Sequence, residues 1–317
     1  HLLFRNNGDG TFTDISESSG IGKHPGKGLG IAIHDFNGDG WPDIAIANDA
    51  VQQQLFLNNK GKFTEAGLEM GIGYDDDGRA FAGMGIDFND YNNDGQPDLF
   101  INALANQRYA LFLNTGSAFD YVSVKSGISD ASALHSGWGA KLIDYDNDGW
   151  KDLFVAQGHV TDNIELTQPN IRYLEPPMLL RNTQGKFSDV AKDSGDIFKK
   201  PLGYVDVVIN CLNGPAVILQ NKGGDNHWLT LDLRGTTSNR DAIGTTVRVI
   251  TEDGLTQTQF VSTAGSYISA NDRRLYFGLG KNKEAKTIEI RWPGGKVQKI
   301  NNLPSRKIHQ ITEPEAN

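Results

Sequence analysis

Three nine-residue stretches carry oxygen-bearing side chains at the first, third, fifth and ninth places. They read DFNGDGWPD from Asp35, DYNNDGQPD from Asp90 and DYDNDGWKD from Asp144. Glycine always stands at the sixth place, where a tight loop around an ion needs a residue without a Cβ atom. Clustered carboxylate, amide and carbonyl oxygens are the hard ligands that Ca²⁺ prefers. The pattern therefore predicts three calcium loops.

Each predicted ligand set consists of four side chains and the backbone carbonyl of the seventh residue. The sets are Asp35, Asn37, Asp39, Trp41 and Asp43; Asp90, Asn92, Asp94, Gln96 and Asp98; and Asp144, Asp146, Asp148, Trp150 and Asp152. A plain turn without metal is the alternative, because Asp, Asn and Gly favour turns by themselves. Three copies at near-constant spacing favour the metal loop. The third loop, with four aspartates, is expected to bind calcium most tightly, because ligand charge raises affinity.

The loops begin as an EF-hand does, but their continuation is different. An EF-hand needs a bidentate glutamate at the twelfth place, where this sequence has Ile46, Ile101 and Val155. Short apolar runs (IAIA, LFIN and LFVA) come directly after the loops and are typical of buried strands rather than long helices. Each loop is therefore expected to connect two β-strands.

A second repeated element accompanies the loops. Four stretches each predict a strand, an Asn/Gly turn and another strand, namely LLFRNNGDGTFTDIS, QLFLNNKGKFTEAG, ALFLNTGSAFDYVS and MLLRNTQGKFSDVA. A Gly-Ile pair follows three of them, at Gly20, Gly71 and Gly127, and a strand of small residues then leads to the next loop. Four strands in about 50 residues are typical of a propeller blade.

These repeats resemble FG-GAP/VCBS repeats, the calcium-binding blades of integrin α-subunits and of many secreted bacterial proteins. The resemblance covers residues 1–221 and implies an all-β fold, a calcium-binding β-propeller. About four repeats are visible, whereas propellers of this family commonly have seven blades. The chain begins at His1, inside what looks like a repeat, which is expected of a processed or truncated chain.

The fourth repeat lacks the beginning of its loop. Residues 203–206 (GYVD) match the end of the other loops, but the first five places and the preceding strand are missing ahead of Gly203. A true deletion would leave Asp206 without co-ligands. We expect instead that residues are absent between Leu202 and Gly203, so that Asp206 is the last ligand of a fourth calcium site.

From Trp228 onward there is no calcium loop, and six short runs, several of them alternating between apolar and polar residues, predict β-strands. They are WLTLDLR, TTVRVIT, TQTQFVS, RLYFGLG, TIEIRW and KIHQIT. These strands predict a second, small β-rich domain. The segments LRGTTSNRDAIGTTVRV, STAGSYISANDRRLYFGLG and IEIRWPGGKV resemble the ASPIC/UnbV domain, over residues 226–312. In that family the domain follows FG-GAP/VCBS repeats, as it does in this chain.

Several other residues could carry chemistry. The polar clusters 239–241 (NRD) and 271–273 (NDR) could contact a glycan or a peptide, although turn capping and cross-strand pairing are commoner roles. His159, in a long insertion at residues 155–177, could be a metal ligand or a catalytic base, but a packing role is commoner. Cys211 is the only cysteine, and its apolar surroundings favour a small buried side chain over a nucleophile.

Charge and composition restrict the function. The net charge of −9 disfavours nucleic acids and anionic membranes as partners, and no apolar run approaches the ~18 residues of a transmembrane segment. Calcium loops of this kind are typical of extracellular, periplasmic or cell-surface proteins. We interpret the protein as a secreted binding or adhesion module with structural calcium, whose partner is a protein or glycan ligand at the cell surface or in the matrix.

The alternative is an enzyme with its active site in the propeller channel or on one face. No catalytic residue is predicted, because the sequence contains no nucleophile elbow, zinc motif or phosphate loop. Propeller enzymes assemble their sites from scattered loops, so this alternative stays open.

Overall fold

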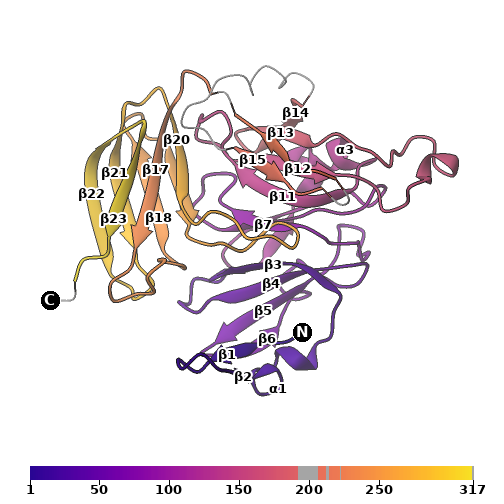
Figure 1. Cartoon of the computed structure of the whole chain (residues 1–317), viewed down its shortest axis with the longest axis horizontal. Coiled ribbons are helices and arrows are strands. Elements are labelled where there is room, and N and C mark those ends of the chain that lie inside the picture. The colour runs from indigo at the N-terminus through magenta and orange to yellow at the C-terminus, as the bar shows by residue number, and fades with distance from the viewer. Residues whose placement is uncertain (192–205, 212–213, 222, 316–317) are drawn as a thin grey trace.

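The computed structural model describes residues 1–191, 206–211, 214–221 and 223–315, and its regular structure is mostly β-strand. Three four-stranded antiparallel sheets follow one another along the chain (Figure 1). The first contains β3 (Gly28–His34), β4 (Asp43–Asn48), β5 (Gln54–Asn59) and β6 (Lys62–Glu65). The second contains β7 (Ile86–Asn89), β8 (Asp98–Ile101), β9 (Ala110–Asn114) and β10 (Phe119–Tyr121). The third contains β11 (Gly137–Ile143), β12 (Asp152–Gln157), β13 (Met178–Thr183) and β14 (Lys186–Asp189).

A two-stranded hairpin stands on each side of these sheets. They are β1 (Phe4–Asn6) with β2 (Phe12–Asp14), and β15 (Val207–Ile209) with β16 (Val217–Leu219). The four predicted strand–turn–strand units are confirmed as the hairpins β1–β2, β5–β6, β9–β10 and β13–β14. The expected discontinuity between Leu202 and Gly203 lies outside the described residues.

The second strand of each full sheet is buried over most or all of its length. Every residue of β4 and β8 is buried, because the apolar side chains on both faces of these strands pack in hydrophobic clusters. One hydrophobic core extends through the three sheets and includes Ala45, Leu99 and Leu153. The apolar runs that come after the loops are thus core strands, as predicted.

The Gly-Ile pairs lie where consecutive sheets meet. Gly71 has a φ of 86°, and a Cβ atom there would collide with the carbonyl oxygen of Phe119 in the next sheet. Gly20 stands in the same relation to Phe63, at 2.5 Å. Only glycine combines this backbone conformation with such a close approach. Short helices adjoin these glycines or lie in the connections, namely α1 (Ser16–Ser19), η1 (Ile21–Lys23), α2 (Ser123–Ser126), α3 (Ile128–Ser132) and η2 (Ile164–Leu166).

The C-terminal strands form two further sheets with a separate hydrophobic core that includes Leu231, Val249 and Trp292. The first contains β20 (Leu275–Gly280), β17 (His227–Arg234) and β23 (Lys307–Thr312), with β17 and β23 parallel. The second contains β19 (Thr256–Phe260), β18 (Thr246–Thr251), β21 (Glu284–Arg291) and β22 (Val297–Pro304). The sequence analysis missed β22, because its polar residues and two asparagines give no apolar run.

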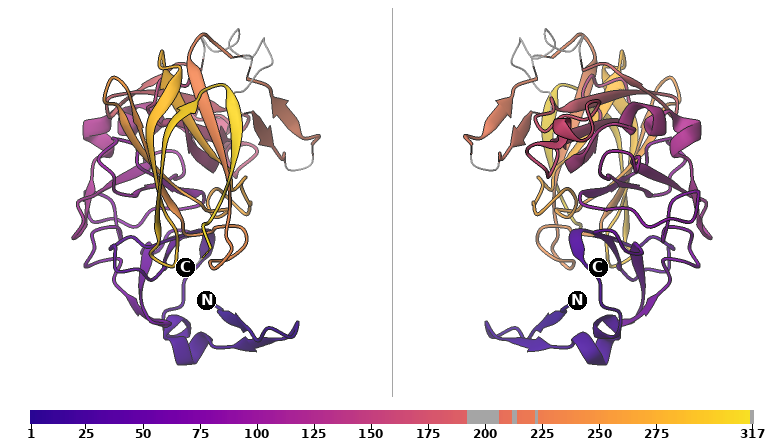
Figure 2. Two further views of the ribbon diagram at one scale, coloured as in Figure 1. Left: turned by 90° about the vertical axis from the view of Figure 1, so that its left-hand side faces the viewer. Right: turned by 90° about the vertical axis from the view of Figure 1, so that its right-hand side faces the viewer.

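The C-terminal strands lie beside the first three sheets, and one segment reaches across to them (Figures 1 and 2). The segment 262–274 contacts the edge strands β3, β7 and β11, for example through a hydrogen bond from Gly265 N to Ile31 O at 3.0 Å. No helix in the described part of the chain is long and apolar enough to span a membrane.

Candidate metal centres

Each nonapeptide connects the first strand of a sheet to the second. The ninth aspartates, Asp43, Asp98 and Asp152, open β4, β8 and β12 and are completely buried. The first aspartate of the first loop, Asp35, is half-buried, whereas the first aspartates of the other two loops, Asp90 and Asp144, are buried. The pairing of the first two strands therefore fixes the position of the ninth aspartate. The loop between them brings the first aspartate back toward it.

The three loops share one backbone conformation. In the second loop the Asp90 carboxylate accepts the N–H groups of Asp94 and Gly95, both at 2.9 Å. The Asp94 carboxylate in turn accepts the N–H of Gln96 at 2.8 Å. The corresponding bonds occur in the loops that begin at Asp35 and Asp144. The chain therefore wraps around its first carboxylate in all three loops.

The fourth and sixth places both require positive φ. Gly38, Asn93 and Asn147 occupy the fourth place, with φ between 58° and 73°. Glycine at the sixth place has φ between 91° and 95°. Asparagine tolerates the left-handed region better than most side chains do, which explains why it alternates with glycine at the fourth place.

Carboxylate oxygens converge in the second and third loops. Asp90, Asp94 and Asp98 present oxygens within 4.8 Å of one another, and so do Asp144, Asp146 and Asp152. These two groups could hold metal ions. Within the described residues, the aspartates of the first loop form no such group, and Asp148 is not a member of the third. The donors are all hard oxygens, which fit Ca²⁺, and Asn37 and Asn92 supply amide oxygens at the third place.

The remaining predicted ligands are placed by the same loops. Trp41, Gln96 and Trp150 donate their N–H groups to the fifth-place aspartate, while ligation by their carbonyl groups stays a prediction. Asp206 accepts the N–H of Asn221 at 2.8 Å. Asp43, Asp98 and Asp152 accept the N–H of Asn58, Asn114 and Asn182 in the same way. Asp206 thus occupies the ninth-place position of a fourth unit.

Burial destabilises the ionised form of these carboxylates when no cation is bound. Desolvation raises the pKa of Asp43 to about 6 and the pKa values of Asp90 and Asp144 to about 7. It also raises the pKa of Asp98 and Asp152 well above the ordinary range. Neighbouring aspartates of the same loop add to the effect by repulsion. A divalent cation would relieve both costs.

These pKa shifts predict an unusual pH dependence for the ion-free protein. A carboxyl whose pKa is raised from 3.8 to about 7 by folding contributes stability below pH 4, and that contribution is lost as the pH rises to 7. The stability of the wild type relative to Asp90→Asn should therefore increase as the pH falls from 8 to 5. Urea unfolding of both proteins in chelator measures this difference, and a difference independent of pH would show that Asp90 titrates normally.

The sequence analysis missed the role of two cations at the third loop, one inside it and one on β13. Arg181 of β13 pairs with Asp146 at 2.7 Å and with Asp148 at 3.3 Å. Lys151 is buried, and its Nζ atom lies 3.3 Å from Gln257 Oε1 of β19. Burial lowers the pKa of Lys151, while the nearby Asp144 and Asp90 carboxylates oppose that shift. The extra aspartate of this loop is therefore offset by positive charge, which weakens the argument that the loop binds calcium most tightly.

Arg181 is expected to compete with the cation of the third loop. Replacing Arg181 by Met keeps an unbranched apolar stem but removes the charge, so the affinity of this site should increase several-fold. Terbium luminescence can measure the affinity of this site, because Trp150 is at the seventh place of the loop and can sensitise the bound ion. The assay should use a Trp41→Phe background to silence the first loop. Unchanged or weaker affinity in Arg181→Met would mean that the arginine helps to build the site.

A repeated asparagine connects neighbouring units. Asn182 Nδ2 donates to Lys151 O in its own sheet at 2.9 Å and to Tyr91 O in the preceding loop at 2.8 Å. Asn114 and Asn221 make the same bridge to the preceding loops, at Phe36 O and Tyr145 O. The asparagine was visible in the repeated hairpin motif, but its role depends on a contact 76 to 91 residues away.

Losing this bridge should destabilise the stack of sheets. We expect Asn182→Ala to lower the free energy of unfolding by about 2–3 kcal/mol, because it leaves two carbonyl groups and one N–H unpaired in a buried place. Asn58→Ala is the matched control. Asn58 makes the bonds within its sheet but, among the described residues, none to a preceding loop. Equal losses in the two variants, measured by urea unfolding, would rule out a contribution from the bridge.

Most of the other candidate residues make contacts that stabilise the local structure. His159 Nδ1 accepts the N–H of Thr161, which is a turn role, and Cys211 is half-buried. Asn239 bonds the backbone of Ile243, whereas Arg273 pairs with Asp232 at 2.6 Å. The insertion begins after Gln157, because β12 extends that far. Asn271 and Asp272, in contrast, line a cavity.

Comparison with known proteins agrees with this organisation. The FG-GAP-like repeat model matches residues 2–46, 35–101 and 90–155, and the ASPIC and UnbV model matches residues 235–317. Cartilage acidic protein 1 of Xenopus tropicalis is 25% identical over 306 residues, which is 94% of this chain and 38% of that protein. The Homo sapiens protein of the same name is 23% identical over 326 residues, or 99% of this chain and 40% of that protein. The chain thus spans about two fifths of these relatives.

A solved structure from Agrocybe aegerita is also similar. It is that of a lectin described as specifically recognising non-reducing terminal N-acetylglucosamine. The match covers 69% of this chain and 46% of that one, with a TM-score of 0.30 and 21% sequence identity. The family models and the arrangement of loops and sheets identify the chain as an FG-GAP repeat protein with a C-terminal ASPIC/UnbV domain, whose distant homologues are cartilage acidic proteins.

Proposed function

We propose that the protein is a calcium-stabilised binding module that works outside the cytoplasm. The observation that carries this proposal is the recurrence of one oxygen-lined loop at the same place in three successive sheets, with carboxylates converging in two of them. Calcium fits better than magnesium, because the loops offer many oxygens in a flexible arrangement rather than a small octahedral cage. Asp206 would close a fourth site of the same kind.

In this proposal calcium is structural. The cation would link the first two strands of each sheet by neutralising carboxylates that burial otherwise destabilises. The side chains that would hold it are those of the first, third, fifth and ninth places. Millimolar extracellular calcium would keep such sites filled, which supports an extracellular, periplasmic or cell-surface location.

We further propose that the sheets are blades of a β-propeller. The edge strands β3, β7 and β11 are the first strands of their sheets, and all three contact the same segment of the C-terminal domain. In a propeller the first strands of the blades surround the central axis. The hairpin β1–β2 would then be the outer half of a further blade. A broad, rigid face built from connecting loops suits recognition of a protein or glycan.

Measurements of metal content test the structural role of calcium, and measurements of ligand binding test the binding function. Elemental analysis of the purified protein after dialysis against calcium should give at least three calcium ions per chain. Asp94→Ala should lose one of them without unfolding the rest. Arrays of glycans and matrix proteins, probed in calcium and in chelator, should give binding only in calcium. Fewer than one ion per chain would refute the structural role, and reproducible turnover of a substrate would favour the enzyme alternative.

A further inference from the structure

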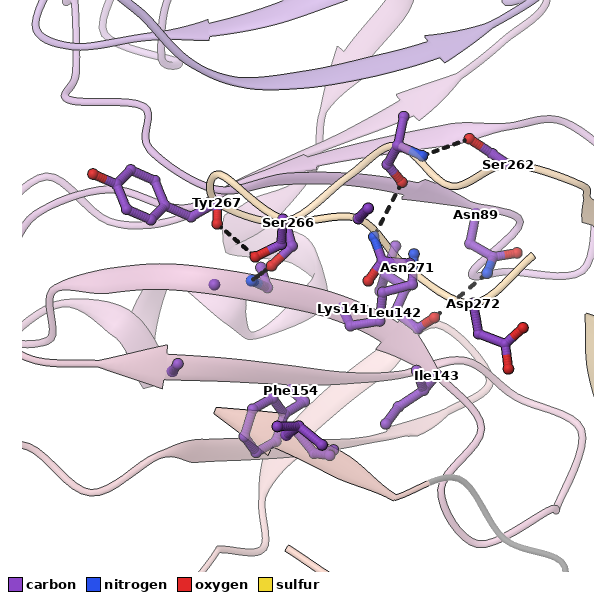
Figure 3. Close-up of a pocket in the computed structure, with 18 of the residues that line it drawn as sticks. Asn89, Lys141, Leu142, Ile143, Phe154, Ser262, Ser266, Tyr267, Asn271 and Asp272 are labelled. Atoms are coloured by element: carbon purple, nitrogen blue, oxygen red, sulfur yellow. Dashed lines mark hydrogen bonds between the residues drawn. The ribbon is translucent and has the colours of Figure 1, made fainter. Parts of the chain in front are cut away.

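A cavity of about 820 Å³ lies between the third sheet and the C-terminal domain (Figure 3). Strands β11 and β12, the hairpin strand β15 and the segment 262–276 form its walls. The volume lies within the ~300–1,000 Å³ of small-molecule binding sites. Such sites commonly occur where two domains meet, and this one adjoins the third calcium loop at Asp144 and Lys151.

The wall contributed by the C-terminal domain is held in place by the edge strands. Ser266 exchanges hydrogen bonds with Ile86 of β7, and its Oγ accepts the N–H of Ala140 of β11 at 3.2 Å. Gly265 is bonded to Ile31 of β3. The cavity is therefore formed before any ligand arrives, which reduces the entropy lost on binding.

Fixed polar groups gather at one end of the cavity. The Asp272 carboxylate accepts Arg274 Nε at 2.8 Å and the Tyr276 hydroxyl at 2.6 Å. Burial raises the pKa of Asp272, but these hydrogen bonds outweigh it and lower the pKa to about 2, so the carboxylate is ionised. Asn271 donates its amide to Ala264 O and Gly265 O, and its amide oxygen accepts no bond within the described residues. Asn89 lines the same cavity as Asn271 and Asp272 (Figure 3).

The basic side chains around the cavity have acidic neighbours. Its lining includes three basic side chains, Lys141, Lys151 and Arg274, and three acidic ones, Asp144, Asp206 and Asp272. Lys141 is additionally paired with the buried carboxylate of Asp87 at 2.7 Å. Arg274 is bonded to Asp272 at 2.8 Å, and the Asp144 carboxylate lies near Lys151. Each basic side chain of the lining therefore has a carboxylate beside it, so the lining favours a neutral ligand with many hydrogen-bonding groups.

Aromatic surface completes the site. The rings of Trp138 and Tyr267 meet edge to face with centroids 5.1 Å apart, and Tyr267 lies at the end of the cavity away from Asp272 (Figure 3). Tyr276 lines the polar end. Aromatic faces pack against C–H groups, while a paired carboxylate and guanidinium present adjacent acceptors and donors. A sugar ring has C–H faces and adjacent hydroxyl groups that match both features.

We propose that this cavity binds a neutral saccharide of one or two sugar units. The Asp272, Arg274 and Asn271 side chains would bond its hydroxyl groups, and Trp138 or Tyr267 would pack against its ring. The assignment rests on the proposed binding function and specifies its ligand class and location. Asp144 and Asp206 belong both to the cavity lining and to the predicted calcium ligands, but none of the side chains proposed to contact the sugar is a predicted calcium ligand. A folded third sheet is needed to form one wall.

Calorimetry and saturation-transfer NMR on the full, calcium-loaded chain test the assignment. The probes are methyl glycosides of neutral hexoses, N-acetylhexosamines and neutral disaccharides, with glucuronate and inorganic phosphate as anionic comparisons. Asp272→Asn keeps the shape but removes the charge, and should weaken saccharide binding at least tenfold. Ser269→Trp should block the cavity from its exposed rim. Arg248→Gln, on the exposed face of β18, is the control and should bind as the wild type does.

Binding of neutral sugars that is lost in Asp272→Asn and Ser269→Trp, but kept in the control, supports the assignment. Binding of the anions alone, no binding of any sugar, or sugar binding indifferent to both variants would overturn it. The two proposals fail differently. If calcium-dependent ligands on the arrays bind normally to both cavity variants, the binding module stands and only the cavity assignment is wrong.

Discussion

Chelating divalent cations should lower the melting temperature of this protein by about 5–15 °C. With a dissociation constant of ~10⁻⁴ M and ~1–2 mM calcium, each filled site stabilises the folded chain by roughly 1.5 kcal/mol. Three sites then contribute about 4–5 kcal/mol, a large share of a typical free energy of unfolding. One kcal/mol corresponds to ~2–4 °C in domains somewhat smaller than this chain, which gives the expected range.

The effect should be specific to calcium and to the loops. Calcium added back after chelation restores the melting temperature, whereas magnesium at the same concentration restores little of it. Asp98→Asn is a useful variant, because Asp98 is completely buried and its backbone contacts are two accepted N–H groups. Because the amide can accept only one of these two N–H groups, this variant should melt somewhat below the wild type in chelator and much further below it in calcium. Identical melting curves of the wild type in chelator and in calcium would mean that the loops are ordinary turns.

Adding one methyl group at Gly278 should cost about 3 kcal/mol or more and weaken the third metal centre. Gly278 lies on β20, and a Cβ atom there would overlap Asp144 Oδ2 and the backbone of Asn147, with Asn147 C at 2.5 Å. The loop cannot move away freely, because Asn147 O accepts the N–H of Gly280 at 2.9 Å. Overpacking against backbone is costly, since no side-chain rotation relieves it.

Urea unfolding and terbium luminescence from the third loop measure the two effects of Gly278→Ala. Gly294→Ala is the matched control in the same domain, because its Cβ atom would meet only Ser238 Oγ, at 3.9 Å. The control should unfold within about 0.5 kcal/mol of the wild type, as surface substitutions do. If Gly278→Ala is as stable as the control and keeps its terbium signal, β20 does not press on the third loop in solution.

The fold and the loops could largely be predicted from the sequence, because the residue patterns that specify them lie within short stretches of the chain. All the ligands of a loop fall within nine residues, and the backbone bonds that shape it span four or five, so spacing and glycine positions were sufficient. The hairpins were equally local, with short Asn/Gly turns between apolar runs. Strand β22 was missed because its pattern is polar, and only pairing with β21 reveals it.

The sequence by itself therefore determined which residues form the oxygen-lined loops and that each loop connects two strands. Only the tertiary structure decided how those loops differ. Arg181 lies 33 residues beyond Asp148, Gln257 lies 106 beyond Lys151, and Gly278 presses on Asp144 from another domain. Packing of distant elements likewise creates the cavity that contains Asp272. Burial and charge at a site are sums over neighbours that chain order does not specify, so similar loops acquire different electrostatics once they are folded.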